Sequence, residues 1–242
     1  DPVFSTSASP FPFLVKRFQK PVLELNELPK IDYVLISHDH YDHLDMESVK
    51  FFKDKDVKFI TPLGVGSHLR KWGISSEKIT ERDWWESVKF EHIEFIATPA
   101  QHFSGRGLFD EAKTLWASWV IRSSQHSVFF SGDSGYDTHF KEIGDKYGPF
   151  DVSFLECGQY NEKWREGHMF PEDAVLAFKD LKAKKLFPVH WGMFELAFHP
   201  WNEPIEKLFA LLRDESIELV VPKFGEIVTL AEKYKVQLWW QE

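Results

Sequence analysis

Three histidines lie within six consecutive positions of the sequence, with aspartates between them. The segment Ser37–Asp45 reads SHDHYDHLD, and it contains His38, His40, Asp42 and His43. Because alternate residues of an extended chain point the same way, His38 and His40 can hold one ion together. A turn after them would bring Asp42 and His43 to a second ion beside the first. Neutral imidazole and carboxylate groups suit Zn²⁺ and similar ions, so this order predicts a metal site.

Three further polar residues each follow an apolar segment that is typical of a β-strand. They are His102 after residues 95–97, Asp133 after 128–130, and His190 after 186–189. Active-site loops commonly lie at such strand ends. Two ions need about four or five ligands each, and one carboxylate can bind both ions. These three residues therefore supply the further ligands that two ions need beyond those in the histidine-rich segment.

The seven candidate ligands divide into two sets around one shared carboxylate. The first ion would be held by His38, His40 and His102. The second ion would be held by Asp42, His43 and His190. Asp133 would bridge the two ions. The expected cofactor is a pair of divalent metal ions, with zinc preferred and iron or manganese as alternatives.

The order of these groups (HxHxDH, a strand-end histidine, Gly-Asp and a final histidine) resembles the metallo-β-lactamase fold superfamily. Over nearly its whole length the chain also resembles one branch, N-acylphosphatidylethanolamine-hydrolysing phospholipase D and its bacterial relatives. The segments that carry this second resemblance are Asp1–Ser5, Ala8–Pro10, Ser37–Asp45, Asp83–Glu86, Pro99–His102, Leu115–Trp119, Ser131–Tyr136, His168–Met169, Pro171-Glu172 and His190–Phe194. HxHxDH alone identifies only the superfamily, whereas the additional segments are specific to the branch.

The resemblance implies an α/β fold, the metallo-β-lactamase-like αβ/βα sandwich, in which helices flank two mixed β-sheets. Strands dominate the middle of the chain and strand–helix alternation its last part, which favours the same architecture. No low-complexity linker interrupts the chain, so residues 1–242 are expected to form a single metallo-hydrolase domain. Members of the superfamily usually begin with strands ahead of the Asp1-Pro2 segment, and we therefore expect N-terminal strands to be missing from this sequence.

The resemblance also assigns roles to residues outside the two ligand sets. Asp1 matches an acidic residue that lies behind the ligands, and His168 matches a pocket histidine that such enzymes need for activity. Arg106 follows the third ligand between two glycines, where its guanidinium could contact a phosphate. Departures from the family pattern are modest: Ser134 replaces a usual Thr, and Gly105-Arg106 replaces a pair of basic residues.

From a pair of metal ions a few ångströms apart, we expect a hydrolase in which a hydroxide that bridges the ions attacks the substrate. Metal ions lower the pKa of a bound water, to about 7 for a single zinc, and neutralise charge on the attacked group. Asp42 and Asp133 would position this hydroxide, while His168 would protonate the leaving group or bind its oxygen. The expected reaction is cleavage of a phosphodiester in a small molecule or a lipid, with phospholipase D-like cleavage of a phospholipid as the specific hypothesis.

Other activities stay open at this point. The same pair of ions would serve a lactone hydrolase or a sugar-phosphate hydrolase. A di-iron redox protein is disfavoured, because such relatives typically carry Glu at the second motif position, which is His40 here, and an added flavin domain. A non-catalytic binding module would be expected to have lost ligands, and all seven are present.

The composition limits the partners and the location of the protein. The chain has 242 residues and a formal net charge of −9 without a run of Lys or Arg, which disfavours a nucleic-acid partner. No apolar run is long enough for a transmembrane segment and no signal peptide is visible, so a cytoplasmic or peripheral membrane location is favoured over secretion. The aromatic content of 16% is compatible with a lipid-facing groove, and the oligomeric state, including a dimer, stays open. The single cysteine, Cys157, is expected to be buried.

Apolar patterns predict the elements that position these groups. Residues 1–30 lack periodicity and are expected to form an irregular arm. Strands are predicted at 32–37, 57–60, 87–90, 93–97, 115–121, 127–130, 151–156, 185–189 and 217–221. Helices are predicted at 46–54, 63–72, 137–146, 171–183 and 203–214, the first with Asp45 as its N-cap. Four histidines in polar contexts are expected at the surface: His68, His92, His126 and His139.

Overall fold

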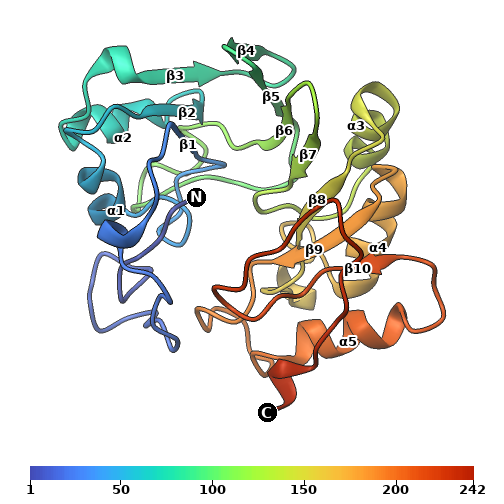
Figure 1. The fold of residues 1–242 in the computed structure, drawn as a ribbon. Coiled ribbons are helices and arrows are strands. Elements are labelled where there is room, and N and C mark those ends of the chain that lie inside the picture. Colours follow the sequence, from blue (N-terminus) through green and yellow to red (C-terminus); the bar gives the residue numbers. More distant parts are fainter.

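The computed structural model describes residues 1–242, which form two β-sheets flanked by helices (Figure 1). The smaller sheet consists of β1 (Tyr33–Leu35), β2 (Lys58–Pro62) and β3 (Ile79–Arg82), in that order. The larger sheet consists, in order, of β10 (Glu218–Leu219), β9 (Lys185–Val189), β8 (Val152–Glu156), β7 (Ser127–Phe130), β6 (Ser118–Arg122), β5 (Ile93–Thr98) and β4 (Ser87–Phe90). The helices are α1 (Met46–Phe51), α2 (Gly66–Lys71), α3 (His139–Tyr147), α4 (Pro171–Asp180) and α5 (Glu203–Leu211). This architecture confirms the predicted α/β sandwich.

The strands of the smaller sheet all run parallel, with Val34 opposite Phe59 and Phe59 opposite Ile79. The expectation of two mixed sheets is therefore wrong for this one. Helix α1 connects β1 to β2, and α2 connects β2 to β3. A helical crossover returns the chain to the edge where the previous strand began, so the next strand runs parallel to it. Side chains from strands and helices share one core, which includes Val49 and Leu69.

Strand β3 was not expected from the sequence. It has the sequence ITER, and all four residues are only half-buried, so it lacks the apolar pattern of a strand. It forms because β2 offers it a row of backbone partners from Phe59 to Pro62. The predicted helices exist, although most are shorter by part of a turn than their apolar patterns suggested. Asp45 caps α1 as predicted, since its carboxylate accepts hydrogen bonds from the backbone N–H groups of Glu47 at 3.4 Å and Ser48 at 3.3 Å.

The larger sheet is mixed, as expected. Strands β4 to β7 pair antiparallel, and β7 to β10 pair parallel. Strand β5 therefore runs in the same direction as β7, β8 and β9, and the carboxyl ends of these four strands lie at one edge of the sheet. Because His102, Asp133 and His190 follow β5, β7 and β9, this topology brings them to the same edge.

The two sheets pack against each other through buried side chains. Their shared core includes Ile60 from β2, Phe95 from β5 and Trp119 from β6. The indole N–H of Trp119 also donates to the backbone oxygen of Ile36 at 3.0 Å. This bond ties the larger sheet to the residue that directly precedes the histidine-rich segment.

Helices α3, α4 and α5 pack on the larger sheet through a third core, which has 21 buried residues. Cys157 belongs to this core and is fully buried, as predicted. Burial raises the pKa of its thiol, which disfavours the reactive thiolate. None of the helices combines the length and the apolar character that crossing a lipid bilayer requires.

The first 32 residues form an irregular arm, apart from one 3₁₀ turn at Leu25–Glu27. An isolated β-bridge between Arg17 and Phe194 attaches this arm to the loop that follows β9. The arm therefore lies beside the carboxyl edge of the larger sheet and contributes its first residue, Asp1, to that region (Figure 1).

Two of the four histidines expected at the surface lie in other environments. His139 is buried, and its Nε2 lies 3.1 Å from Ser134 Oγ. His68 is half-buried, and its Nε2 lies 3.2 Å from Asp39 Oδ2. His68 lies in α2 and His139 in α3. Both helices have mostly polar sequences, so the sequence did not show that one face of each packs against the loops that carry the candidate ligands. The other two histidines are exposed, as predicted.

Candidate metal centre

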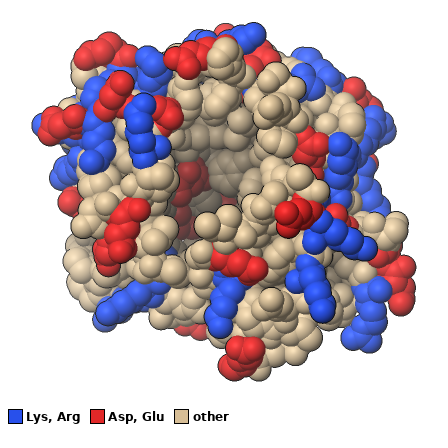
Figure 2. All heavy atoms as spheres, in the orientation of Figure 1, with Lys and Arg blue, Asp and Glu red and all other residues tan.

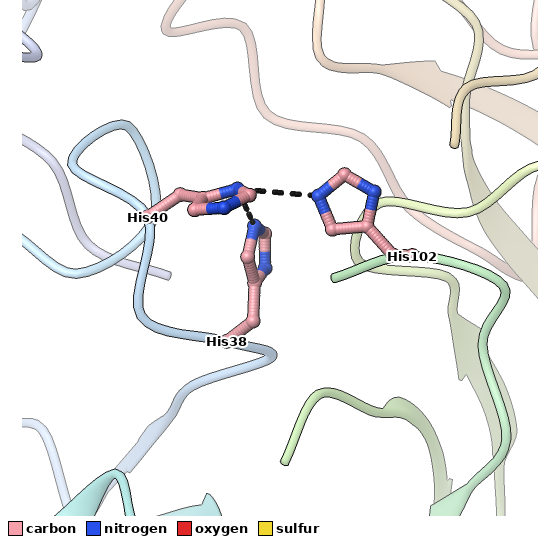
Figure 3. Close-up of side chains that lie close together, drawn as sticks. All are labelled: His38, His40 and His102. Atoms are coloured by element: carbon pink, nitrogen blue, oxygen red, sulfur yellow. Dashed lines mark hydrogen bonds between the residues drawn. The ribbon is translucent and has the colours of Figure 1, made fainter. Parts of the chain in front are cut away.

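Three histidines from two separate loops point their ring nitrogens toward one another (Figure 3). His38 and His40 lie in the loop after β1, and His102 lies in the loop after β5. His38 Nε2 lies 2.9 Å from His40 Nδ1, and His102 Nε2 lies 3.2 Å from the same atom. This is the arrangement that the sequence predicted for the first set of ligands.

The second predicted set also comes together. His190 Nε2 lies 3.0 Å from Asp42 Oδ2 and 3.2 Å from His43 Nε2. Asp42 and His43 lie in the turn that ends the histidine-rich segment, whereas His190 follows β9. Residues almost 150 positions apart in the chain therefore meet, with separations of 147 and 148 between the contacting pairs.

Asp133 lies between these two groups. Its Oδ2 is 3.1 Å from His43 Nε2 in the second set. The same oxygen is 3.8 Å from His102 Nε2 and 3.9 Å from His38 Nε2 in the first set. Asp133 is buried, so its carboxylate is directed at these rings and not at solvent. One carboxylate oxygen is thus within reach of both sets, as a bridging ligand requires.

The outward ring nitrogens of the histidines are held by the protein. His43 Nδ1 lies 2.7 Å from Asp1 Oδ2, and His102 Nδ1 lies 2.9 Å from the backbone oxygen of Gly167. An acceptor at Nδ1 fixes the proton there and leaves Nε2 free to bind a metal. The structure therefore places Asp1 behind His43, where the family resemblance predicted an acidic residue.

The charge states of these groups fit a pair of divalent cations. Burial lowers the pKa of His102 to about 3 and holds the pKa of His38 well below its ordinary value, so both rings are neutral, the form that binds metal. Burial opposes ionisation of Asp133, yet His190 and His43 hold its pKa well below the usual range.

The surroundings of His190 favour positive charge. Burial lowers its pKa, but Asp133 and Asp42 together raise that pKa well above the ordinary value. Asp133 Oδ1 and His190 Nδ1 are buried 3.2 Å from each other, and neither atom makes a hydrogen bond of acceptable geometry. A bound ion or water commonly satisfies buried polar atoms of this kind. The donor set and the electrostatics thus fit divalent metal ions.

The backbone of His190 is held in an unusual conformation. Its φ angle is 65°, in the left-handed region that residues with a side chain rarely adopt. The carbonyl oxygen of His190 packs so closely on Gly158 that a Cβ there would lie 1.6 Å from it. The side-chain amide of Gln159 donates to the same carbonyl at 3.3 Å. Two residues that follow β8 therefore hold this loop in place.

Arg106 contacts the histidine-rich loop from behind. Its Nη1 donates to the backbone oxygens of Asp39 at 2.6 Å and Leu44 at 2.8 Å, and its guanidinium stacks 3.9 Å over the ring of Tyr41. These contacts hold both ends of the turn that carries the candidate ligands. The predicted contact of Arg106 with a phosphate stays a prediction, and the structure gives this residue a scaffolding role that the sequence did not reveal.

His168 joins the centre beside the first set of ligands. Its Nδ1 lies 4.0 Å from Asp133 Oδ2, and its ring lies 5.1 Å from the ring of His102. Burial lowers its pKa, but Glu156 reverses that effect and raises the pKa above its ordinary value. Sequence reasoning missed Glu156 because it ends an apolar strand and belongs to none of the recognised motifs. Its signal was a lone carboxylate as the last residue of β8, at the sheet edge near which Asp133 follows β7.

A cavity of about 390 Å³ opens beside the second set of ligands. Part of its wall consists of the candidate ligands, and much of the rest is apolar. The apolar lining includes Val3, Phe130, Trp191, Met193, Phe194 and Leu196. Figure 2 shows that one face of the molecule is hollowed, with acidic side chains deep inside. Polar groups at one end of an apolar cavity are typical of a site for a small-molecule substrate.

Comparison with known families identifies the class of protein. A model of the Beta-lactamase superfamily domain matches residues 1–191, and the chain therefore belongs to this family. The crystal structure of isothiocyanate hydrolase from Delia radicum gut bacteria has the same fold, with a TM-score of 0.71 and 18% identity over 93% of this chain and 89% of that one. The protein is therefore a member of the β-lactamase superfamily with the metallo-β-lactamase fold, and this fold implies bound divalent metal ions.

Two curated relatives narrow the comparison. N-acyl-phosphatidylethanolamine-hydrolyzing phospholipase D 1 of Caenorhabditis elegans is 35% identical over 226 residues, which are 88% of this chain and 64% of that protein. Uncharacterized protein Rv0906 of Mycobacterium tuberculosis is 42% identical over 246 residues, which are 100% of this chain and 66% of that protein. The resemblance to the phospholipase D branch is confirmed, and the chain spans about two thirds of the length of these relatives.

Proposed function

We propose that this protein is a dinuclear metal-dependent hydrolase that cleaves a phosphodiester, with a phospholipid as the favoured substrate. The observation that carries this proposal is the position of Asp133, whose Oδ2 lies within 4 Å of His38, His43 and His102. A carboxylate that reaches both sets of ligands would hold two ions at the short separation that dinuclear hydrolases use, about 3.5–4 Å.

The residues that would hold the ions are those that the sequence predicted. The first ion would bind His38, His40 and His102. The second would bind Asp42, His43 and His190, and Asp133 would bind both. When bound, two such ions supply Lewis acids for the phosphoryl oxygens and ionise water near neutral pH.

The protein's own groups would orient the reactants and move protons. Asp42 and Asp133 present carboxylate oxygens that accept hydrogen bonds from an attacking water. His168 lies at the edge of the cluster, with its Nδ1 turned toward Glu156 and its side chain 14% exposed. In its protonated form, His168 would give the proton on Nε2 to the leaving-group oxygen or donate a hydrogen bond to it, and the ring would keep its other proton on Nδ1.

Apolar surface around the site supports a lipid as substrate. The cavity wall is largely apolar, and three large side chains in loops after candidate ligands are highly exposed: Leu108 at 92%, Phe109 at 85% and Phe198 at 82%. Exposed apolar side chains of this size are typical of interaction surfaces. We propose that these loops contact a membrane peripherally, and that the protein is cytoplasmic or bound to a membrane surface.

The substrate class can be tested with zinc-loaded protein and its Asp133→Asn variant. We expect the wild type to hydrolyse bis(p-nitrophenyl) phosphate, and to release the headgroup of N-acylphosphatidylethanolamine presented in vesicles. The variant should do neither. Hydrolysis of a lactone or a sugar phosphate with no cleavage of either phosphodiester would overturn the proposal in favour of the alternative that uses the same site.

A further inference from the structure

We infer that Glu156 is a positioning residue that holds His168 in place with its proton on Nδ1, so that Nε2 faces the reacting groups. The orientation of the His168 ring does not depend on which reaction is catalysed, whereas the role of that ring in catalysis rests on the proposed function. It starts from the position of Glu156 at the end of β8, where its side chain is fully buried.

The carboxylate of Glu156 connects two loops of the site. Its Oε1 accepts a hydrogen bond from the backbone N–H of Met169 at 2.9 Å, and the backbone N–H of Ser134 lies 3.5 Å from the same oxygen. Met169 directly follows His168, and Ser134 directly follows Asp133. One buried oxygen thus fixes the backbone immediately after the bridging carboxylate and immediately after the pocket histidine.

The same carboxylate faces the rings of two histidines. Oε1 lies 3.3 Å from His168 Nδ1, and Oε2 lies 3.7 Å from His190 Nδ1. His168 Nδ1 is buried and has no other hydrogen-bond partner, although its contact with Oε1 does not reach hydrogen-bond geometry. An ionised carboxylate only accepts hydrogen bonds, so it favours the ring form in which the facing nitrogen carries the hydrogen. For a neutral His168 this leaves the lone pair on Nε2.

The burial of Glu156 indicates that its charge serves these contacts. Removing a carboxylate from water costs several kcal/mol unless hydrogen-bond donors replace the water. No lysine or arginine forms an ion pair with Glu156; its neighbours are backbone amides and the two histidines. If Glu156 only joined two loops, it would need to present an acceptor only to their backbone N–H groups. If it also orients His168, it must present an acceptor to Nδ1 of that ring as well.

Two substitutions separate these roles. In Glu156→Gln the amide oxygen can still accept from Met169 N–H and from His168 Nδ1. Glu156→Leu has a similar volume and no acceptor at all. Glu166→Gln is the matched control. Glu166 is exposed and lies two positions from His168, and this substitution removes the same charge as Glu156→Gln.

The deciding measurement is the tautomer of His168 by ¹⁵N NMR of zinc-loaded, histidine-labelled protein, with the signal assigned by its loss in His168→Ala. We expect Nδ1 to carry hydrogen in the wild type, in Glu166→Gln and in Glu156→Gln, and Nε2–H to replace Nδ1–H in Glu156→Leu. Nε2–H with unprotonated Nδ1 in the wild type would overturn the inference, and this result can be obtained even if Glu156→Leu fails to fold. An unchanged tautomer in a folded Glu156→Leu would overturn it as well.

Kinetics on whichever substrate is cleaved provides a second readout. Loss of a residue behind an active group typically costs about 10–100-fold. We expect Glu156→Leu to lower kcat by about this factor with little change in KM, and Glu156→Gln to restore part of it. In the His168→Ala background, Glu156→Leu should have no further effect on kcat, and an equal effect in both backgrounds would contradict the inference. Because the NMR result needs no substrate, a wrong substrate class would leave it unaffected.

Discussion

The Asp1 carboxylate lies 2.7 Å from His43 Nδ1, although 42 positions separate the two residues in the chain. Its other oxygen accepts the backbone N–H of Ser37 at 2.6 Å. Asp1 therefore joins the start of the histidine-rich loop to one of its metal-facing rings. This contact gives an irregular arm a direct part in the candidate metal centre.

Replacing Asp1 should weaken the binding of the second metal ion. Asp1→Asn puts an amide opposite His43, which reduces the basicity of the ring and loosens its orientation. We expect the affinity of the more weakly bound zinc to fall by about 10–100-fold. Calorimetric titration of zinc into metal-free protein measures this, with the exposed Asp32→Asn as control. Equal affinities for the two variants would show that Asp1 does not support the site.

The metal-free protein should lose stability as the pH falls below 6.5, and His102 should account for part of that loss. Its folded pKa of about 3 lies below the ordinary value of 6.5, so between these values the unfolded state binds one more proton. Stability thus rises with pH in this window, with a contribution of about 1.4 kcal/mol per pH unit. Urea unfolding at a series of pH values should give a shallower slope for His102→Gln, and identical slopes would contradict a neutral buried His102.

Arg106→Lys tests whether the guanidinium supports the loop or binds a phosphate. A lysine ammonium keeps the charge but cannot reproduce the planar stacking on Tyr41 and the bonds to two carbonyls. We expect a lower Tm, by about 2–4 °C for each kcal/mol lost, and a KM within about twofold of the wild type. A large increase in KM with an unchanged Tm would instead support the phosphate contact predicted from the sequence.

Trp119 should be one of the most important residues for stability. It is fully buried between the two sheets, and its indole N–H binds the oxygen of Ile36. Trp119→Ala should lower the free energy of unfolding by about 3–5 kcal/mol, because it removes a large core side chain and leaves a buried acceptor unpaired. Chemical denaturation with Phe11→Ala as control, a residue 55% exposed, should show a far smaller change for the control. Similar losses for both variants would contradict this view of the core.

The candidate metal ligands could be predicted from the sequence better than the residues that hold the loops of the site in place. Metal-facing groups such as His38 and Asp133 follow apolar strands in a recognisable order, and the chain topology then has little freedom in how it brings them together. Glu156, Arg106 and Asp39 could not be placed in the same way, because their partners are backbone groups and side chains of other loops, whose positions depend on how those loops pack. Strand β3 was missed for a related reason, since its pairing with β2 and not its own composition makes it a strand.

Anomalous diffraction from crystals of the zinc-loaded protein will show whether Asp133 bridges two metal ions. We expect two zinc peaks per chain, with an Asp133 oxygen about 2.0–2.2 Å from each, the usual Zn–O distance. Three histidine nitrogens should surround one peak, and Asp42, His43 and His190 the other. A single peak, or two peaks of which one lies beyond the reach of Asp133, would rule out a bridging role for this carboxylate.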